Sequence, residues 1–252
     1  MTTRDIRLDA LSSHEVACVW DHVQGLFARH FELPVGYNVL ASQADATFGR
    51  WLRVVEVAGG PVGAVLVRGF RTQVEGRETV VFRAAACVDN EYRRRCTAVR
   101  FVSRVVLGYW LRHPWARIYY VDPVIHFSSF LVIHKHVALA YPTLHDGMPA
   151  RIQRLFGALK RGLLSAYEFT FANPYVCRIP FNTVESAEDA RAWQRRAESD
   201  RYVSRFIHAG AAERDRGLLC IVPIDVWNVA LSVPRILGKV GLRLMSVPAR
   251  GA

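Results

Sequence analysis

The sequence predicts a mixed α/β (α+β) protein, and two features of its hydrophobic pattern carry this prediction. First, apolar runs at 79–88 and 116–121 enclose a segment whose apolar residues recur at helical spacing from Val99 to Trp110, which indicates strand, helix and strand in that order. Second, two further β-rich runs flank the sequence Ala58-Gly-Gly-Pro61, which is typical of a hairpin. Strands joined directly and strands joined by a helix therefore occur in the same chain.

Caps, breaks and periodicity place the other elements. Ser12 followed by Glu15 is typical of a helix start, and Pro34 and Gly36 end the apolar stripe that follows. The elements expected in chain order are a strand at 6–8, a helix from 13 to about 31, strands at 50–57, 62–70 and 79–88, a helix at 99–110, a strand at 116–121 and a helix at 130–140.

Composition indicates a globular protein without a membrane span. Half of the 252 residues are apolar, which is enough for a full core, and no apolar segment reaches the length of about 18 residues that a spanning helix needs. The first residues lack the apolar core of a secretion signal. The five cysteines are scattered without a Cys-x-x-Cys pair, so neither a disulfide framework nor a structural metal is predicted, and we expect a cytoplasmic location.

The formal net charge of +11 favours anionic partners. Coenzyme A, an acidic acyl carrier protein, nucleic acid and an anionic membrane surface all have the required charge. The highest local density of positive charge is the turn at Arg93, Arg94 and Arg95, between the strand at 79–88 and the helix that follows. Backbone N–H groups, the positive end of the helix dipole and guanidinium groups would meet a pyrophosphate there.

This turn resembles motif A of the GCN5-related N-acetyltransferase superfamily, Arg/Gln-x-x-Gly-x-Gly/Ala. It reads Arg93-Arg-Arg-Cys96-Thr-Ala98, with Cys96 where the family has Gly, and it is preceded by Val88-x-x-x-Tyr92. The resemblance extends over about residues 4–145 in the order of elements. It implies an acyltransferase fold with a central mixed, mostly antiparallel sheet flanked by helices, and an acyl-coenzyme A donor whose pyrophosphate the turn wraps. The donor-binding residues it implies are Val88, Arg93, Arg94, Arg95, Cys96, Thr97 and Ala98.

Acyl transfer to an amine needs a base for the amine and an acid for the departing sulfur. The candidates are Asp122, which either caps a helix turn or orients a base, His126 just after the strand, and Tyr120 if it faces the cleft rather than the core. His134 is either a further acid–base candidate or an ordinary surface residue. Arg83 interrupts an apolar strand and either faces solvent or pairs with a carboxylate of the acceptor.

The expected organisation is a catalytic domain at 1–145 and a C-terminal extension at 146–252 packed on it. The extension begins with a basic amphipathic helix at 152–163, which either packs on its own domain, docks a carrier protein or lies on a membrane surface. Its later part has a strand at 217–224 and a last helix beginning at Val226. Such an apolar extension would cover the acyl or acceptor site and lengthen a tunnel for longer acyl groups.

Three hypotheses for function follow. The leading one is an N-acyltransferase that moves an acyl group from acyl-coenzyme A to an amine-bearing small molecule or peptide, without a metal. The second draws the acyl group from an acyl carrier protein, as synthases of N-acyl amino acids or homoserine lactones do. The third is a non-catalytic module of the same fold that binds nucleic acid or an acidic protein, although no aromatic–basic nucleic-acid motif occurs.

Overall fold

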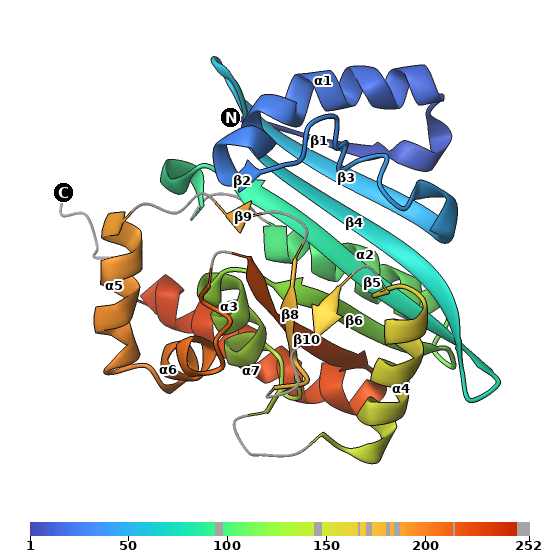
Figure 1. The fold of residues 1–252 in the computed structure, drawn as a ribbon, viewed down its shortest axis with the longest axis vertical. Helices are drawn as coiled ribbons and strands as arrows, with labels where there is room; N and C mark the ends of the chain where they lie inside the picture. Colours follow the sequence, from blue (N-terminus) through green and yellow to red (C-terminus); the bar gives the residue numbers. More distant parts are fainter. Residues whose placement is uncertain are drawn as a thin grey trace.

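A computed structural model describes residues 1–93, 98–143, 148–165, 167–169, 173–179, 182–183, 187–213 and 215–245. Its centre is a sheet of eight strands in the order β1-β3-β4-β5-β6-β10-β8-β7 (Figure 1). These strands are β1 (Thr2–Arg7), β3 (Thr47–Val57), β4 (Gly60–Val74), β5 (Arg77–Val88), β6 (Arg117–Val124), β10 (Arg216–Ile224), β8 (Val176–Arg178) and β7 (Glu168–Phe169). A separate pair is formed by β2 (Phe31–Glu32) and β9 (Asn182–Thr183).

Helices flank the sheet. They are α1 (Ser13–His30), α2 (Ala98–Arg112), α3 (Phe127–His136), α4 (Ala150–Arg161), α5 (Ala187–Ala197), α6 (Arg201–His208) and α7 (Val226–Met245), with short 3-10 turns η1 (Leu8–Ala10), η2 (Ala44–Ala46) and η3 (Asn90–Tyr92). The predicted order of one strand, a helix, three antiparallel strands, a helix, a strand and a helix is confirmed. Among the strands described, β5 and β6 form the one parallel pair, because α2 connects them as a crossover.

The start of α1 is fixed by a capping box, as the sequence predicts. The Ser12 side chain accepts a hydrogen bond from the Glu15 backbone N–H, and the Glu15 carboxylate accepts one from the Ser12 N–H. Each of these bonds satisfies a donor that the first turn of a helix leaves unpaired. The helix then buries Val23, Leu26 and Phe27 against the sheet.

Alternation along β4 shows which helices cover which face of the sheet. Leu66 packs in the cluster with α1, and Phe70 packs in the cluster with α4. Val65 and Val67 point the other way and pack with α2, because side chains alternate along a strand. Helices α1 and α4 therefore cover one face of the sheet and α2 covers the opposite face, where it lies behind the strands in Figure 1.

Helix α4 packs on its own domain, one of the alternatives that its sequence allows. Its apolar residues Ile152, Leu155, Phe156 and Leu159 are all buried in the cluster that lies on β4, β5, β6 and β10. The apolar face of this helix is therefore not free to enter a membrane surface or to dock a carrier protein. Within the described residues, the helices are too short or too polar for a membrane crossing.

Strand β10 joins the C-terminal third of the chain to the same sheet. It pairs antiparallel with β6 from Leu218↔Val124 to Ile224↔Ile118 and with β8 on its other side. The boundary expected near residue 145 therefore falls within a continuous sheet.

Pairing with β10 also lengthens β6. The predictions that this strand ends at Val121 and that Asp122 caps the next helix are wrong, because Asp122 pairs with Cys220 inside the sheet. The N-cap of α3 is His126 instead, whose Nδ1 accepts a hydrogen bond from the Ser128 N–H.

Candidate active site

The parallel strands β5 and β6 separate partway along their length. They pair from Thr79↔Arg117 to Phe82↔Tyr120, yet β5 continues to Val88 and β6 continues to Val124. Beyond Phe82, β5 is paired with β4 on one side only, and beyond Tyr120, β6 is paired with β10 on one side only. The two facing strand edges therefore have backbone groups available to an extended chain placed between them.

A cluster of charged side chains lies where the strands separate. Arg83 follows the last paired residue of β5, and its Nη2 lies 3.8 Å from Oδ1 of Asp122 on β6. Arg83 is two residues after Val81 and so lies on the same face of the sheet, which α4 covers. Asp122 is two residues after Tyr120 and lies on the face that α2 covers. The two side chains approach each other because no strand pairing closes the sheet between them.

The Asp122 carboxyl is set up to exchange a proton near neutral pH. Burial raises its pKa to about 6, against the opposing effect of the positive charges of Arg83 and Arg68. The Tyr120 hydroxyl donates a hydrogen bond of 3.3 Å to Asp122 Oδ2, and burial raises the pKa of Tyr120 well above its usual value. Tyr120 therefore stays protonated, while Asp122 loses its proton within the range in which enzymes use a general base.

The turn expected to hold the donor's pyrophosphate is described only at its two ends. Arg94, Arg95, Cys96 and Thr97 lie outside the described residues. Val88 closes β5 and Ala98 opens α2. Arg93 is exposed, and its Nε donates to the Val88 carbonyl at 3.4 Å.

The start of this turn is held against the end of α1. The Asp89 carboxylate forms an ion pair with Arg29 at 2.9 Å and a hydrogen bond with His30 Nε2 at 3.0 Å. These contacts fix the point where the chain leaves β5.

His126 lies beyond the end of β6, at the first turn of α3. Its Nδ1 is 2.7 Å from Ser128 Oγ, and its ring contacts those of Phe127 and Trp193. These contacts hold the imidazole in one orientation. A catalytic role for His126 stays a prediction.

His134 lies in the apolar cluster between α3 and α6. Its ring packs against Phe130 and Tyr202, and its buried Nε2 has no hydrogen-bond partner among the described residues. Burial lowers the pKa of His134 to about 4. The side chain is therefore neutral at physiological pH, and a part in catalysis stays a prediction for this residue too.

The buried neutral state of His134 makes stability depend on pH. The folded-state pKa is lowered, so the unfolded chain binds the proton more tightly, and stability is lost as the pH falls from about 6.5 to about 4. The loss amounts to up to about 3 kcal/mol. In His134→Phe the melting temperature should fall less between pH 7 and pH 4.5 than in the wild type. His14→Gln, at an exposed position of α1, is the control, and equal losses in all three proteins would contradict the prediction.

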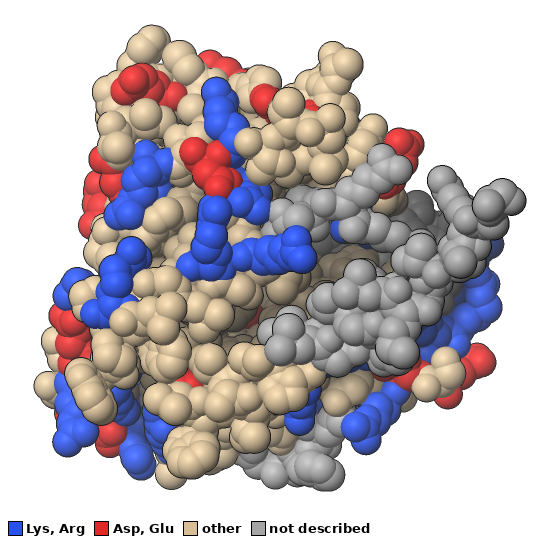
Figure 2. All heavy atoms as spheres, turned by 180° about the vertical axis from the view of Figure 1, so that it is seen from behind, with Lys and Arg blue, Asp and Glu red and all other residues tan. Residues whose placement is uncertain are grey.

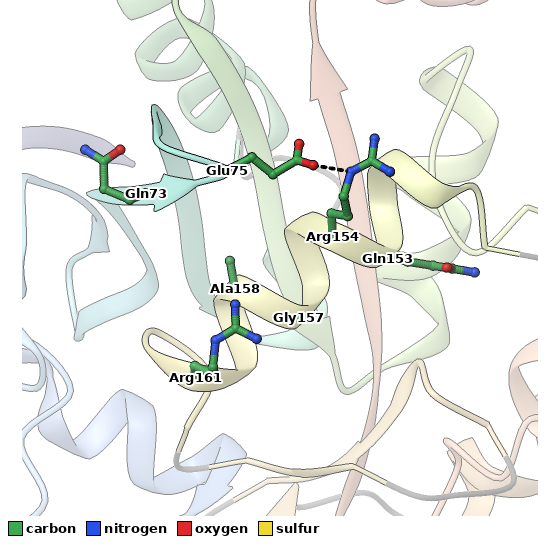
Figure 3. A pocket seen from close by; sticks show the side chains of 7 residues that line it. All are labelled: Gln73, Glu75, Gln153, Arg154, Gly157, Ala158 and Arg161. Atoms are coloured by element: carbon green, nitrogen blue, oxygen red, sulfur yellow. Dashed lines mark ion pairs between the residues drawn. The ribbon is translucent and has the colours of Figure 1, made fainter.

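Two surface pockets lie at the other end of β5. One, of about 380 Å³, lies between the β4–β5 turn and α4, and Figure 3 shows the Glu75–Arg154 ion pair of 2.6 Å across it. The second, of about 600 Å³, is lined by Glu75, Arg77, Arg117 and Arg151. Arg77 and Arg117 begin β5 and β6, so both pockets are remote from the place where these strands separate.

Positive charge on the face opposite to that of Figure 1 is divided among several groups. On the face shown in Figure 2, Lys and Arg side chains form separate groups with Asp and Glu among them. The described residues contain no group of three or more His, Cys, Asp or Glu side chains that could hold a metal ion. The side chains described at the strand separation carry carboxyl, hydroxyl and guanidinium groups.

The class of fold follows from these features. A mostly antiparallel sheet, a parallel pair connected by α2 and the separation of that pair at its carboxyl end form the mixed α/β arrangement that the sequence predicts. The predicted fold class is confirmed.

Comparisons with known proteins gave matches to solved structures alone. Neither the family models nor the curated proteins include a match. Similar structures include a ribosomal-protein-alanine N-acetyltransferase of Brucella melitensis, with 13% identity over 59% of this chain and 99% of that one and a TM-score of 0.37. NAA60 of Arabidopsis thaliana in complex with acetyl-CoA has 11% identity over 88% of this chain and 99% of that one, with a TM-score of 0.35.

A further similar structure is a probable N-acyltransferase of Enterococcus faecalis, with 10% identity and a TM-score of 0.37. The match covers 56% of this chain and 33% of that one. At these TM-scores the likenesses assign no activity, and the fold class rests on the strand order and register of this chain.

Arg68, Tyr167 and Ser42 are members of the cluster that sequence reasoning missed. Arg68 lies directly opposite Arg83 in the β4–β5 register, Tyr167 receives a hydrogen bond from Arg83, and Ser42 receives two from Arg68. Arg68 could have been found from the sequence, because it is an arginine within the apolar run at 62–70. Tyr167 and Ser42 come from loops, and no periodicity in the sequence places them.

Proposed function

We propose that the protein is an N-acyltransferase that moves an acyl group from a coenzyme A thioester to an amine. The observation that carries the proposal is the separation of β5 from β6, with α2 following β5 in the chain. An extended donor arm that contains amides can pair with the open edge of β5 between Arg83 and Val88. The pyrophosphate of such a donor would then lie at the turn before α2, where helix dipole and arginines favour an anion.

Asp122 and Tyr120 are proposed to handle the protons. The Asp122 carboxylate takes a proton from the acceptor ammonium, and the neutral nitrogen attacks the thioester carbonyl carbon. The carbon–sulfur bond breaks, and the proton that the attacking nitrogen loses as the amide forms passes to the departing thiolate. Tyr120 orients the carboxylate through its hydrogen bond. His126 and His134 are given no step, because their observed contacts are with α3, α5 and α6.

Donor binding gives the direct test. Saturating coenzyme A or acetyl-coenzyme A, at about 100 times Kd, should stabilise the fold by about 2.7 kcal/mol, which is a rise in melting temperature of roughly 5–10 °C for a chain of this size. Arg93→Ala should reduce the rise, and Arg112→Ala, at the far end of α2, is the matched control. No rise with any thioester would contradict the proposal.

The acyl group and its carrier form the finer part of the proposal. We propose an acyl group longer than acetyl, because β10 places the apolar C-terminal segment beside β6. Turnover of acetyl, octanoyl and palmitoyl thioesters, each on coenzyme A and on an acyl carrier protein, measures both properties. A clear preference for acetyl would remove the longer-chain part and leave acyl transfer itself standing.

A further inference from the structure

Two buried arginines face each other across the β4–β5 pair. Arg68 and Arg83 are cross-strand partners, and their exposed fractions are 7% and 3%. Like charges directly opposite each other on a sheet destabilise it, and burial of an arginine without a full set of partners destabilises it further. Burial and the charge of Arg83 lower the pKa of Arg68 to about 10, so both side chains stay positively charged at neutral pH.

The hydrogen bonds within the cluster leave donors unused. Arg68 Nη1 donates to the Ser42 carbonyl and hydroxyl oxygens, each at 2.9 Å, and Arg83 Nη2 donates to the Tyr167 hydroxyl at 2.7 Å. Three buried nitrogens have no acceptor in the part of the chain that the structure describes: Arg68 Nε, Arg83 Nε and Arg83 Nη1. Buried native donors are nearly always paired, so these three nitrogens are available to an acceptor that a bound molecule supplies.

The charge count favours a monoanion. Two guanidinium groups face one carboxylate, Asp122, which lies 3.8 Å from Arg83 and whose negative charge also raises the pKa of Arg68. With Asp122 ionised the excess is one positive charge. A carboxylate would neutralise this excess and offer two oxygens to the planar guanidinium donors, whereas a phosphate dianion would reverse its sign.

The position of the cluster connects it with the reacting groups. Arg83 is the first residue of β5 beyond the pairing with β6, beside the proposed base Asp122. The side chain of Asp122 is 18% exposed, and Ser42 and Tyr167 are partly exposed, so the cluster is reached from solvent at its rim. Ser42 lies in the segment between α1 and β3, on the face of the sheet that α1 covers.

We propose that Arg68 and Arg83 bind a carboxylate of the co-substrate, and that the acceptor is therefore an amine that carries a carboxylate, as an α-amino acid does. The inference rests on the proposed acyl transfer for its choice of acceptor. Binding of the carboxylate satisfies the unused donors and holds the neighbouring amine beside Asp122. The bound carboxylate could also belong to the donor, if its acyl group is that of a dicarboxylic acid. The experiment distinguishes a carboxylate of the acceptor from a carboxylate of the donor.

The test compares matched amines. With a coenzyme A thioester as donor, kcat/KM is measured for glycine, leucine and phenylalanine and for the carboxamide of each. The wild type should prefer the carboxylates by about 100-fold, the size expected for charge-assisted hydrogen bonds from two buried groups. The amine of a carboxamide is less basic and more fully neutral, a difference that acts against the expected result.

The variants assign the preference to the cluster. In Arg83→Gln and Arg68→Gln the ratio of carboxylate to carboxamide should fall below about 10-fold, since each removes one charged donor group. Arg71→Gln changes an arginine that lies on β4, as Arg68 does, but is exposed and paired with Glu78. This variant should keep the wild-type ratio. Arg83→Lys keeps the charge and should retain part of the preference. If the glutamine variants fail to fold, the ratio of carboxylate to carboxamide in the wild type and in Arg83→Lys still tests the proposal.

The remaining outcomes separate this inference from the proposed function. A preference for succinyl- over butyryl-coenzyme A, with none between the amines, would overturn the assignment to the acceptor. If no acyl transfer occurs, thermal shift with leucine and N-acetyl-leucine against their carboxamides tests the cluster directly. Stabilisation by the carboxylates alone, lost in Arg83→Gln, would support the site although the proposed function had failed. No discrimination in rate or in stabilisation would overturn the inference.

Discussion

Replacement of Asp122 by Asn is expected to lower kcat/KM for acyl transfer by about 100- to 10,000-fold, the range for loss of a general base. The amide cannot take the proton of the acceptor ammonium, while its size keeps the packing beside Arg83. Because burial raises the pKa of Asp122 to about 6, the wild-type rate should rise with pH through about 6, as the carboxyl loses its proton. That limb of the pH profile should be absent in Asp122→Asn.

The controls distinguish a base from a packing residue. Tyr120→Phe removes one hydrogen bond to the carboxylate and should lower kcat/KM by about 10-fold. The rise of the rate with pH should then occur at a different pH but should not disappear. Asp21→Asn, at an exposed carboxylate on α1, should leave both rate and profile unchanged. A fully active Asp122→Asn with an unchanged profile would show that the base lies elsewhere, and His126 would be the next candidate.

Replacement of Phe82 by Ala is expected to have the largest effect on stability. Phe82 is fully buried, and its ring contacts those of Phe48, Trp51 and Tyr109 at centroid distances of 5.9, 6.1 and 5.3 Å. Its removal leaves a cavity at the last paired position of β5 and β6, at a cost of about 3–5 kcal/mol. Urea unfolding should show a lower midpoint with an unchanged slope.

An exposed apolar residue on the helix above this cluster is the comparison. Leu111 of α2 is 70% exposed, and Leu111→Ala should change the free energy of unfolding by less than about 0.5 kcal/mol. A loss below about 1 kcal/mol in Phe82→Ala would mean that the aromatic cluster closes over the cavity. The strand separation would then depend less on this contact than the packing indicates.

The hydrophobic pattern predicts much of the sheet because local periodicity and caps agree with the tertiary structure. Ser12 and Glu15 mark the start of α1, and the turn at 58–61 sets the β3–β4 hairpin. The pattern fails for Asp122, since a carboxylate after an apolar run reads as the end of a strand. Here β6 continues through it because β10, from a distant part of the chain, supplies the pairing.

The sequence points to single members of the candidate site, whose catalytic roles stay predictions, but not to the way in which they come together. Asp122 and Tyr120 follow from the chemistry of acyl transfer, and Arg83 is visible as a charge in an apolar strand. Arg68 needs the cross-strand register, and Tyr167 needs the path of a loop, neither of which is a local property. For His134, the prediction of an ordinary surface position is wrong, since its ring packs against those of Phe130 and Tyr202.

The place of β10 beside β6 has a consequence for synthesis of the chain on the ribosome. About 90 residues separate the end of β6 from the start of β10, and at about 5–20 residues per second their translation takes roughly 5–20 s. During that interval the edge of β6 that later pairs with β10 is unpaired, and its backbone groups can pair with any other strand that it meets. A nascent chain stalled within this window should therefore recruit chaperones or aggregate, and one released beyond Ile224 should not.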